Sequence, residues 1–348
     1  MFTRRTLSKL LAATSLAPAT ALSQGRPPLS RIAFGSCAKQ TLPQPIWEPI
    51  LAYRPDLFIF AGDNVYGDFD SPEAAELKRA YDEARHIAGY ARLRETVPHL
   101  AVWDDHDYGV NDGGAEFAHK ALAKDLFLDF WEAPATDIRR TRGGIYDSRV
   151  IGPPGMRVQV ILLDVRWFRS PLKPTDKRGA PGRQRYLPDP DPAKTMLGAE
   201  QWAWLAQELR RPAELRLIVS STQVLAEGHG WERWGNLPLE KQKLIDTIRA
   251  SGAKGVVLLS GDRHVGALYR ETPADLYPLY EATSSGLNMV YWAAKEPGPN
   301  RLGALYAAAN FGVVDIDWWE RKLVLALRDD GGNTRRSADI AFDTLGIA

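Results

Sequence analysis

Residues 57–68, Leu-Phe-Ile-Phe-Ala-Gly-Asp-Asn-Val-Tyr-Gly-Asp, form the stretch from which we interpret the rest of the chain. Bulky apolar residues that run into a small Ala-Gly pair predict a strand buried on both faces. The strand delivers Asp63, Asn64 and Tyr66 at its carboxyl end, which is the edge where open α/β sheets place their ligands. A carboxylate and a phenol three residues apart can both bind a hard metal ion. Because Gly-Asp turns after buried strands are common, this stretch does not decide the function alone.

Composition limits the classes of protein to consider. The 348 residues are 45% hydrophobic, which is enough for one large domain or two smaller ones. Lys and Arg number 44 and Asp and Glu 43, so we expect no stable nucleic-acid complex. The single cysteine, Cys37, excludes an internal disulfide, and the fold must therefore rely on its apolar core.

The first residues indicate export. A positive start with Arg4 and Arg5, a short apolar run and the small residues at 19–21 are typical of a secretory signal, here of the twin-arginine type. We expect residues 1–23 to engage the twin-arginine export machinery and the mature protein to be periplasmic or secreted. A frayed basic helix is the alternative. No later apolar stretch reaches about 18 residues, so we expect no transmembrane anchor.

Periodicity along the chain predicts alternating strands and helices. Further strands are predicted at 31–35, 99–103, 144–150, 157–164, 216–221, 255–260, 279–283, 312–316 and 322–327. Helices are predicted at 45–53, 71–96, 114–131, 198–211 and 238–250. The first helix connects two parallel strands, which places Cys37 and Asp63 along one sheet edge. The stretch 170–197 is long for a loop, and we expect a functional rim or a mobile segment there.

Metal-capable side chains recur at the ends of predicted strands. After the strand at 99–103, three acids and a histidine stand together at 104–107, and such a group is costly to hold without a cation. Salt bridges and capped turns are the alternative explanation for any one position. The set as a whole favours a metal site, and it consists of Cys37, Asp63, Tyr66, Asp105, His106, Gln223, Asp262 and His264.

The types of ligand suggest two different cations. Two metals about 3.5 to 4 Å apart can clamp a phosphoryl group and need a bridging carboxylate, for which we choose Asp63. The phenolate of Tyr66 and the thiolate of Cys37 suit iron(III) better than magnesium. The oxygen donors that suit calcium, manganese or zinc are Asp105, Asp262 and the amide of Gln223.

These motifs resemble a known family. Gly62-Asp63-x-x-Tyr66, the Asp105-His106 pair and the stretch 261–264, Gly-Asp-Arg-His, are similar to the motifs of calcineurin-like metallophosphoesterases. Within that superfamily, the residues around Cys37, the string Trp-Asp-Asp-His-Asp-Tyr at 103–108 and the twin-arginine signal resemble PhoD-type alkaline phosphatases, which are related to purple acid phosphatases. The resemblance covers roughly residues 31–327.

The resemblance implies a fold and a reaction. The fold would be an α/β four-layer αββα sandwich, as a single PhoD-like domain over residues 24–348. The reaction would be hydrolysis of phosphomonoesters or phosphodiesters, as small-molecule substrates, by a metal-bound hydroxide. His106 would be an outer-sphere acid or a phosphate contact, and Asp105 stands where the wider superfamily has asparagine, which leaves the second metal open. The implied iron(III) ligands are Cys37, Asp63, Tyr66 and His264, and the implied ligands of calcium or another divalent ion are Asp63, Asp105 and Asp262.

Some roles and functions stay open at this level. Arg166 and Arg263 are expected to offset charge that develops on the phosphate. Asp164 and Arg166 could steady a substrate phosphate, or they could equally pair with each other or with Arg169. His229 either contacts substrate or is a solvent-exposed loop histidine. The competing functions are a phosphodiesterase for phospholipids or nucleotides and a metal-dependent phosphate-binding protein without turnover.

Overall fold

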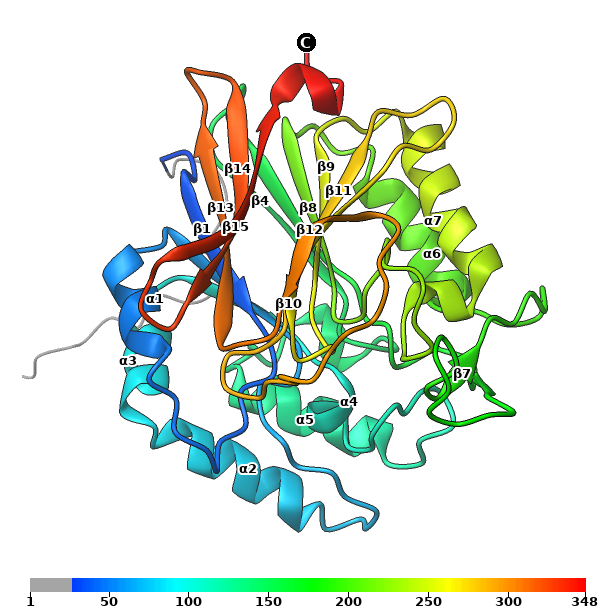
Figure 1. Cartoon of the computed structure of the whole chain (residues 1–348). Coiled ribbons are helices and arrows are strands. Elements are labelled where there is room, and N and C mark those ends of the chain that lie inside the picture. Colours follow the sequence, from blue (N-terminus) through cyan, green and yellow to red (C-terminus); the bar gives the residue numbers. More distant parts are fainter. Residues whose placement is uncertain (1–26) are drawn as a thin grey trace, which may run out of the picture.

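The computed structural model describes residues 27–348, so the predicted signal peptide lies outside the described residues (Figure 1). Two large sheets make up the centre of the fold. The six-stranded sheet has the order β15 (Thr334–Ala341), β14 (Lys322–Asp329), β13 (Asn310–Asp317), β1 (Arg31–Gly35), β2 (Leu57–Ala61), β3 (His99–Val102). The seven-stranded sheet has the order β12 (Arg301–Tyr306), β10 (Gly266–Glu271), β11 (Leu279–Ser284), β9 (Val256–Ser260), β8 (Leu215–Ser220), β5 (Val158–Leu162), β4 (Asp147–Ile151).

Strand direction divides each sheet into a parallel and an antiparallel part. In the six-stranded sheet, β1, β2 and β3 are parallel, whereas β13, β14 and β15 add antiparallel neighbours. In the seven-stranded sheet, β5, β8, β9 and β11 are parallel, and β4, β10 and β12 are antiparallel to their neighbours. Parallel strands end at the same edge, so their carboxyl ends can share one site.

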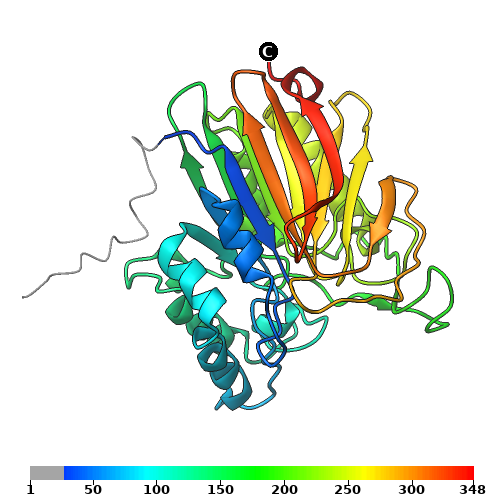
Figure 2. The ribbon, with the colours of Figure 1, turned by 60° about the vertical axis from the view of Figure 1, so that its left-hand side comes forward.

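Helices cover the outer face of the seven-stranded sheet and the part of the six-stranded sheet around β1, β2 and β3, whereas none of the described helices covers β14 and β15 in either view (Figures 1 and 2). The helices are α1 (Trp47–Tyr53), α2 (Ala75–Arg85), α3 (Ala88–Thr96), α4 (Asp105–Tyr108), α5 (Lys120–Phe130), α6 (Gly198–Glu208) and α7 (Pro238–Ser251). Side chains of β8 show the layering, because Leu217 and Val219 join the core between the sheets while Ile218 joins the core under α6 and α7. The predicted four-layer αββα arrangement is confirmed.

The predicted elements differ from the structure where local contacts override the apolar pattern. The predicted helix 71–96 is two helices, α2 and α3, because Ile87 between them is extended. The predicted helix 114–131 begins only at Lys120, and the residues before it form turns in which Ala115 donates its backbone N–H to the carbonyl of Arg169. The predictions missed β10, β12 and β15, and β15 is a mostly exposed edge strand with no apolar alternation.

The stretch 170–197 contains little regular structure. It holds one short hairpin, formed by β6 (Lys173–Pro174) and β7 (Tyr186–Leu187). Hydrogen bonds fix its second half to the main body, because Arg185 and Tyr186 both donate backbone N–H groups to the carbonyl of Gly230, at 2.9 and 2.8 Å. Within residues 27–348, none of the helices is long and apolar enough to cross a membrane.

The two sheets touch at the carboxyl ends of their parallel strands. Ser36, just after β1, donates its backbone N–H to the carbonyl of Ser284 on β11 at 3.1 Å. Gly261, just after β9, is close to β1 and β2, since a Cβ placed on it would lie 2.5 Å from Ser36 Oγ and 2.8 Å from the Ala61 carbonyl oxygen. Side chains that follow these strands therefore meet in one place.

Candidate metal centre

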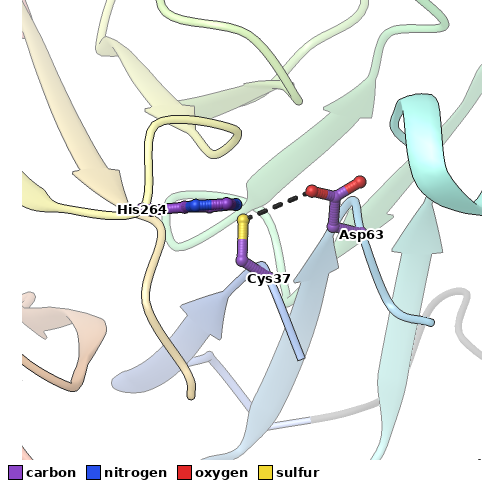
Figure 3. Close-up of side chains that lie close together, drawn as sticks. All are labelled: Cys37, Asp63 and His264. Carbon is purple, nitrogen blue, oxygen red and sulfur yellow. Dashed lines mark hydrogen bonds between the residues drawn. The ribbon is translucent and has the colours of Figure 1, made fainter. Parts of the chain in front are cut away.

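Three candidate ligands meet where β1, β2 and β9 end. Cys37, Asp63 and His264 each offer a donor atom, and these atoms lie within 4.8 Å of one another (Figure 3). The Cys37 Sγ and Asp63 Oδ2 are 3.4 Å apart. The Tyr66 hydroxyl completes the group, at 3.1 Å from Asp63 Oδ2 and 3.1 Å from His264 Nε2. We call these four residues the first cluster.

Carboxylates form a second cluster that shares a member with the first. Asp63, Asp105 and His106 lie within 4.8 Å of one another, as do Asp104, Asp105 and Asp262. We call Asp63, Asp104, Asp105 and Asp262 the second cluster. Asp63 belongs to both clusters, which is the position that a bridging carboxylate requires.

The backbone at the candidate ligands is in an unusual conformation. Among residues 27–348, ten non-glycine residues have positive φ, and four of them are Cys37, Asp63, Asp262 and His264. This region is sparsely populated for residues with a Cβ, and such outliers gather at functional sites, where the surrounding structure must hold them. Each ligand thus stands on a sharp turn that directs its side chain back across the strand ends.

Glycine at position 62 is required by the fold around Asp63. Gly62 has φ +103°, and a Cβ there would lie 2.6 Å from the Cβ of Asp104 and 2.8 Å from that of Ser221. The chain after β2 therefore passes between the ends of β3 and β8. This passage is what brings Asp63 close to Asp104 and Asp105.

The electrostatics of the second cluster indicate that it binds cations. Burial raises the pKa of Asp63 well above its usual range, and Asp105 and Cys37 raise it further. Burial, with Asp104 and Asp105, does the same for the pKa of Asp262. In the described part of the chain, Asp104 Oδ2 and Asp105 Oδ1 are buried without a hydrogen-bond partner. Burial raises the pKa of Asp105, but His106 and Arg166 outweigh burial and hold this pKa below its usual range. Asp63 and Asp262, whose pKa values are raised, need a cation to be stable as anions, so the donor set fits bound metal.

The first cluster offers donors that a strong Lewis acid would bind. Burial raises the pKa of Cys37 to about 12, and burial and Asp63 raise the pKa of Tyr66 well above its usual range. Both side chains ligate as anions, so a cation must displace their protons. Burial, with Arg263, lowers the pKa of His264 to about 4, which keeps its imidazole neutral and able to ligate. Thiolate, phenolate, carboxylate and imidazole together fit iron(III).

His106 lies at the outer side of the second cluster. Its Nδ1 is 2.8 Å from Asp68 Oδ2, and its ring packs on that of Tyr66 with 4.2 Å between centroids. Burial lowers the pKa of His106, but the carboxylates of Asp105 and Asp68 outweigh burial and raise this pKa to about 9. A protonated imidazole in this place can donate to a phosphate oxygen, and cations bound nearby would reduce its pKa.

In the structure, Arg166 forms ion pairs with carboxylates of the protein. Its guanidinium is fully buried, 2.7 Å from Asp104 Oδ1 through Nε and 2.8 Å from Glu232 Oε2 through Nη1. The side chain of Asp164 instead accepts hydrogen bonds from backbone groups, including the N–H of Arg166 at 2.9 Å. The alternative in which the Asp164 side chain pairs with an arginine side chain is therefore wrong. Glu232, which follows a glycine-rich loop, had no signal in the sequence.

Gln223, Arg263 and His229 have partners that the sequence did not reveal. The amide oxygen of Gln223 is 3.1 Å from His229 Nε2, so one of its two lone pairs accepts a hydrogen bond from His229. Arg263 donates to Glu296 at 2.7 Å. The alternative that His229 is solvent-exposed is wrong, because it is only 2% exposed. Burial, with Arg263, lowers its pKa well below the usual range, so His229 is neutral.

Within the string 104–107, the structure separates two roles. Asp104 and Asp105 both belong to the second cluster, whereas the sequence predicts only Asp105 as a ligand. Asp107 points elsewhere and accepts hydrogen bonds from the side chain of Asn64 at 2.6 Å and the backbone of Asp104 at 2.6 Å. Asn64 and Asp107 thus hold the turns that carry the ligands.

Two packed sheets with clustered metal ligands where their strand ends meet define a metallophosphoesterase fold. The chain belongs to the PhoD-like phosphatase family, whose model matches residues 32–292, more than half of the sequence. Alkaline phosphatase D of Bacillus subtilis (strain 168) is 20% identical over 257 residues. The match includes 68% of this chain and 42% of that protein, so the chain spans less than half the length of this relative.

Solved structures support the same fold. The structure of PhoD superposes with a TM-score of 0.69 at 16% identity, over 92% of this chain and 71% of that one. The purple acid phosphatase PPD1 from yellow lupin (Lupinus luteus) seeds gives 0.60 at 10% identity, over 93% and 56%. GAP50, the anchor in the inner membrane complex of Plasmodium, gives 0.56 at 10% identity, over 90% and 89%. At these identities the likeness shows the fold alone.

Proposed function

We propose that this protein is an exported, metal-dependent phosphoesterase that hydrolyses small phosphomonoesters, phosphodiesters or both. The observation that carries the proposal is the sharing of Asp63 between two ligand clusters at the touching ends of two sheets. Family membership supports the reaction class. Export is proposed from residues 1–23 alone, and residues 24–348 are proposed to form a single domain.

The residues present divide into two proposed metal sites. Cys37, Tyr66 and His264, with Asp63, would hold iron(III). Asp63 would also join Asp105 and Asp262 at a divalent ion, for which calcium is our first choice and manganese or zinc the alternatives. When bound, the two cations would neutralise charge on the phosphate and lower the pKa of a bound water.

The protein's own residues would position and protonate the substrate. Asp68 holds Nδ1 of His106, which leaves Nε2 of the same ring to donate a proton to the leaving oxygen. Arg166 is fully engaged by two carboxylates, so we assign it the task of fixing Asp104 beside the second cluster. Arg263, predicted to offset charge on the phosphate, is held by Glu296 and would act on substrate only from that position.

Turnover of simple esters tests the proposal. Metal-loaded protein should hydrolyse chromogenic aryl phosphates, and Asp63→Ala should abolish this activity because both sites lose a ligand. Asp129→Ala, which removes an exposed carboxylate far from the strand ends, is the matched control and should be fully active. If no mono- or diester is hydrolysed but inorganic phosphate binds in calorimetry, the protein is a phosphate-binding protein and the proposal is overturned.

A spectroscopic test addresses the iron separately. If Tyr66 binds iron(III), the protein should show a visible phenolate-to-iron absorption band that disappears in Tyr66→Phe. Elemental analysis of protein exported by its own signal should find iron and one divalent metal. A colourless protein with full activity would contradict the iron assignment and leave a pair of divalent ions.

A further inference from the structure

A pocket of about 510 Å³ lies beside the two clusters, and we call it the side pocket. Three segments form its walls, namely residues 178–185 next to β7, the loop that ends at Trp231, and residues 291–297. Figure 1 shows the first segment around the label of β7. The side chains that give the pocket its chemistry are Arg178, Arg185, Trp231, Tyr291, Lys295 and Glu296.

Hydrogen bonds link two walls of the side pocket to residues of the metal centre. Arg185 in its wall pairs with Asp112, and Asp112 donates its backbone N–H to Asp105 Oδ2 at 2.7 Å. On the opposite side, Tyr291 donates its backbone N–H to the carbonyl of His264 at 2.8 Å. A phosphate ester held at the clusters could therefore extend its organic group into this pocket.

Hydrogen bonds from its own backbone and from that of Gly230 hold Trp231 in place. Its N–H donates to His229 Nδ1 at 3.3 Å, and His229 Nε2 donates to the amide oxygen of Gln223 at 3.1 Å. The preceding Gly230 donates its N–H to Gln184 Oε1 at 2.6 Å. Gln223 and His229 thus position an aromatic side chain, which gives a role to two residues that the proposed reaction does not use directly.

The Trp231 ring lies in the wall of the pocket, close to two guanidinium groups and a second aromatic ring. The Arg185 guanidinium lies 5.3 Å from its centroid and that of Arg263 lies 4.9 Å away. The ring of Tyr291 meets it edge-on, with 6.2 Å between centroids and 78° between planes. Glu296 pairs with Arg263 and Asp112 pairs with Arg185, so protein carboxylates already balance the two cations that lie over the Trp231 ring.

Two further cations stand at the pocket without protein partners. Arg178 and Lys295 are exposed, and neither makes an ion pair with any of the described residues. A ligand should therefore be planar and aromatic where it meets Trp231, and the positive field of Arg178 and Lys295 should attract its phosphate toward the site. A phosphate ester with an aromatic organic group has both properties.

We propose that the side pocket binds the organic group of the substrate and makes the enzyme selective for phosphate esters with a planar aromatic ring. This inference rests on the proposed phosphoesterase function and adds its substrate class. Trp231 is the specificity-determining residue, by stacking on the ring. The ring could be a nucleobase or a simple aryl group, and the experiment below distinguishes the two.

Three monoesters with primary alcohol leaving groups isolate the effect of the ring. These are adenosine 5′-monophosphate, benzyl phosphate and glycerol 3-phosphate, compared by kcat/KM in the metal-loaded enzyme. Stacking of one base on an aromatic side chain should favour adenosine monophosphate over glycerol phosphate by about tenfold to a hundredfold. Trp231→Leu should remove this preference while the rate with glycerol phosphate stays nearly unchanged, and Trp231→Phe should keep part of it.

The outcomes separate this inference from the function on which it rests. The control Trp319→Leu removes a tryptophan that is 87% exposed outside the side pocket, and it should keep the wild-type preference. If benzyl phosphate and adenosine monophosphate are preferred equally over glycerol phosphate, a simple aryl ring is sufficient for recognition. If adenosine monophosphate is preferred over benzyl phosphate, the pocket is a nucleobase site. If glycerol phosphate is hydrolysed as fast as the others, or if Trp231→Leu keeps the preference, the side-pocket inference is wrong. Absence of turnover with all three and also with a chromogenic aryl phosphodiester would instead contradict the proposed function.

Discussion

Replacing Arg166 by methionine would test whether this arginine supports the metal centre or touches the substrate. Arg166 is fully buried, and its guanidinium binds both Asp104 and Glu232. Methionine has a similar length but no charge, so Asp104 would keep only the hydroxyl of Ser221 as a side-chain partner. Removal of one member of a buried ion pair costs about 3–5 kcal/mol, because the remaining charge is left without compensation.

The magnitude can be expressed as a shift of the thermal midpoint. An unfolding entropy of about 2.1 cal/mol/K per residue gives about 0.7 kcal/mol/K for a domain of this size, so we expect Tm to fall by about 4–7 °C. Calorimetry should use metal-free protein, since a bound cation would add its own stabilisation. The control Arg79→Met removes a surface pair with Glu83 that is 4.0 Å long, and it should change stability by less than about 1 kcal/mol.

A variant that keeps its stability but loses substrate affinity would support the prediction from sequence that Arg166 offsets charge on the phosphate. If Arg166 steadies the phosphate, Arg166→Met should leave Tm unchanged and should raise KM strongly at saturating metal. If Arg166 positions Asp104, the loss of stability should dominate and KM for aryl phosphate should change little once metal is saturating. An unchanged Tm together with a large rise in KM would refute the supporting role.

Two further predictions concern the packing and the pH dependence of stability. Gly261→Ala should destabilise the protein by about 1–3 kcal/mol and weaken metal binding, because the new Cβ would lie 2.8 Å from the backbone oxygen of Ala61. Calorimetry would measure the loss of stability and metal titration the loss of affinity. An unchanged Tm would contradict the prediction. Burial lowers the pKa of His99, so the unfolded chain binds a proton at a higher pH than the folded protein, and stability should be lost as pH falls below about 6.5. In Tm measured from pH 7 to 5, His99→Phe should reduce this loss. Parallel curves for the two proteins would exclude His99 as the cause.

The buried strands and the positions of their ends could be predicted from sequence because both depend on local signals. The run that begins at Leu57 is buried at every position of β2, and Cys37 and Asp63 do lie at one sheet edge. Strand β15 could not be predicted, since its residues are largely exposed and its place depends on pairing with β14. Apolar periodicity records which residues are buried, whereas an edge strand is determined by the hydrogen bonds of its neighbour.

The side-chain partners inside the site could not be predicted, because they depend on contacts between distant segments. Glu232 reaches Arg166 across the fold, and no spacing in the sequence relates the two residues. Likewise, Gln223 has the right type of oxygen for a metal and the right place after β8, but that oxygen accepts a hydrogen bond from His229. Residue type and strand position identify candidates, and only the three-dimensional partners decide how each donor is used.

The division of the ligands between the two sheets links metal binding to folding. Cys37 and Asp63 follow strands of the six-stranded sheet, whereas Asp262 and His264 follow a strand of the seven-stranded sheet. Without cations, the buried carboxylates repel one another where the sheets touch, and several ligands hold strained backbone conformations. Bound metal would remove the repulsion between the carboxylates and compensate for the backbone strain. Its binding free energy would therefore also hold the two sheets together at this edge. A site made in this way can be complete only after both sheets have formed and packed.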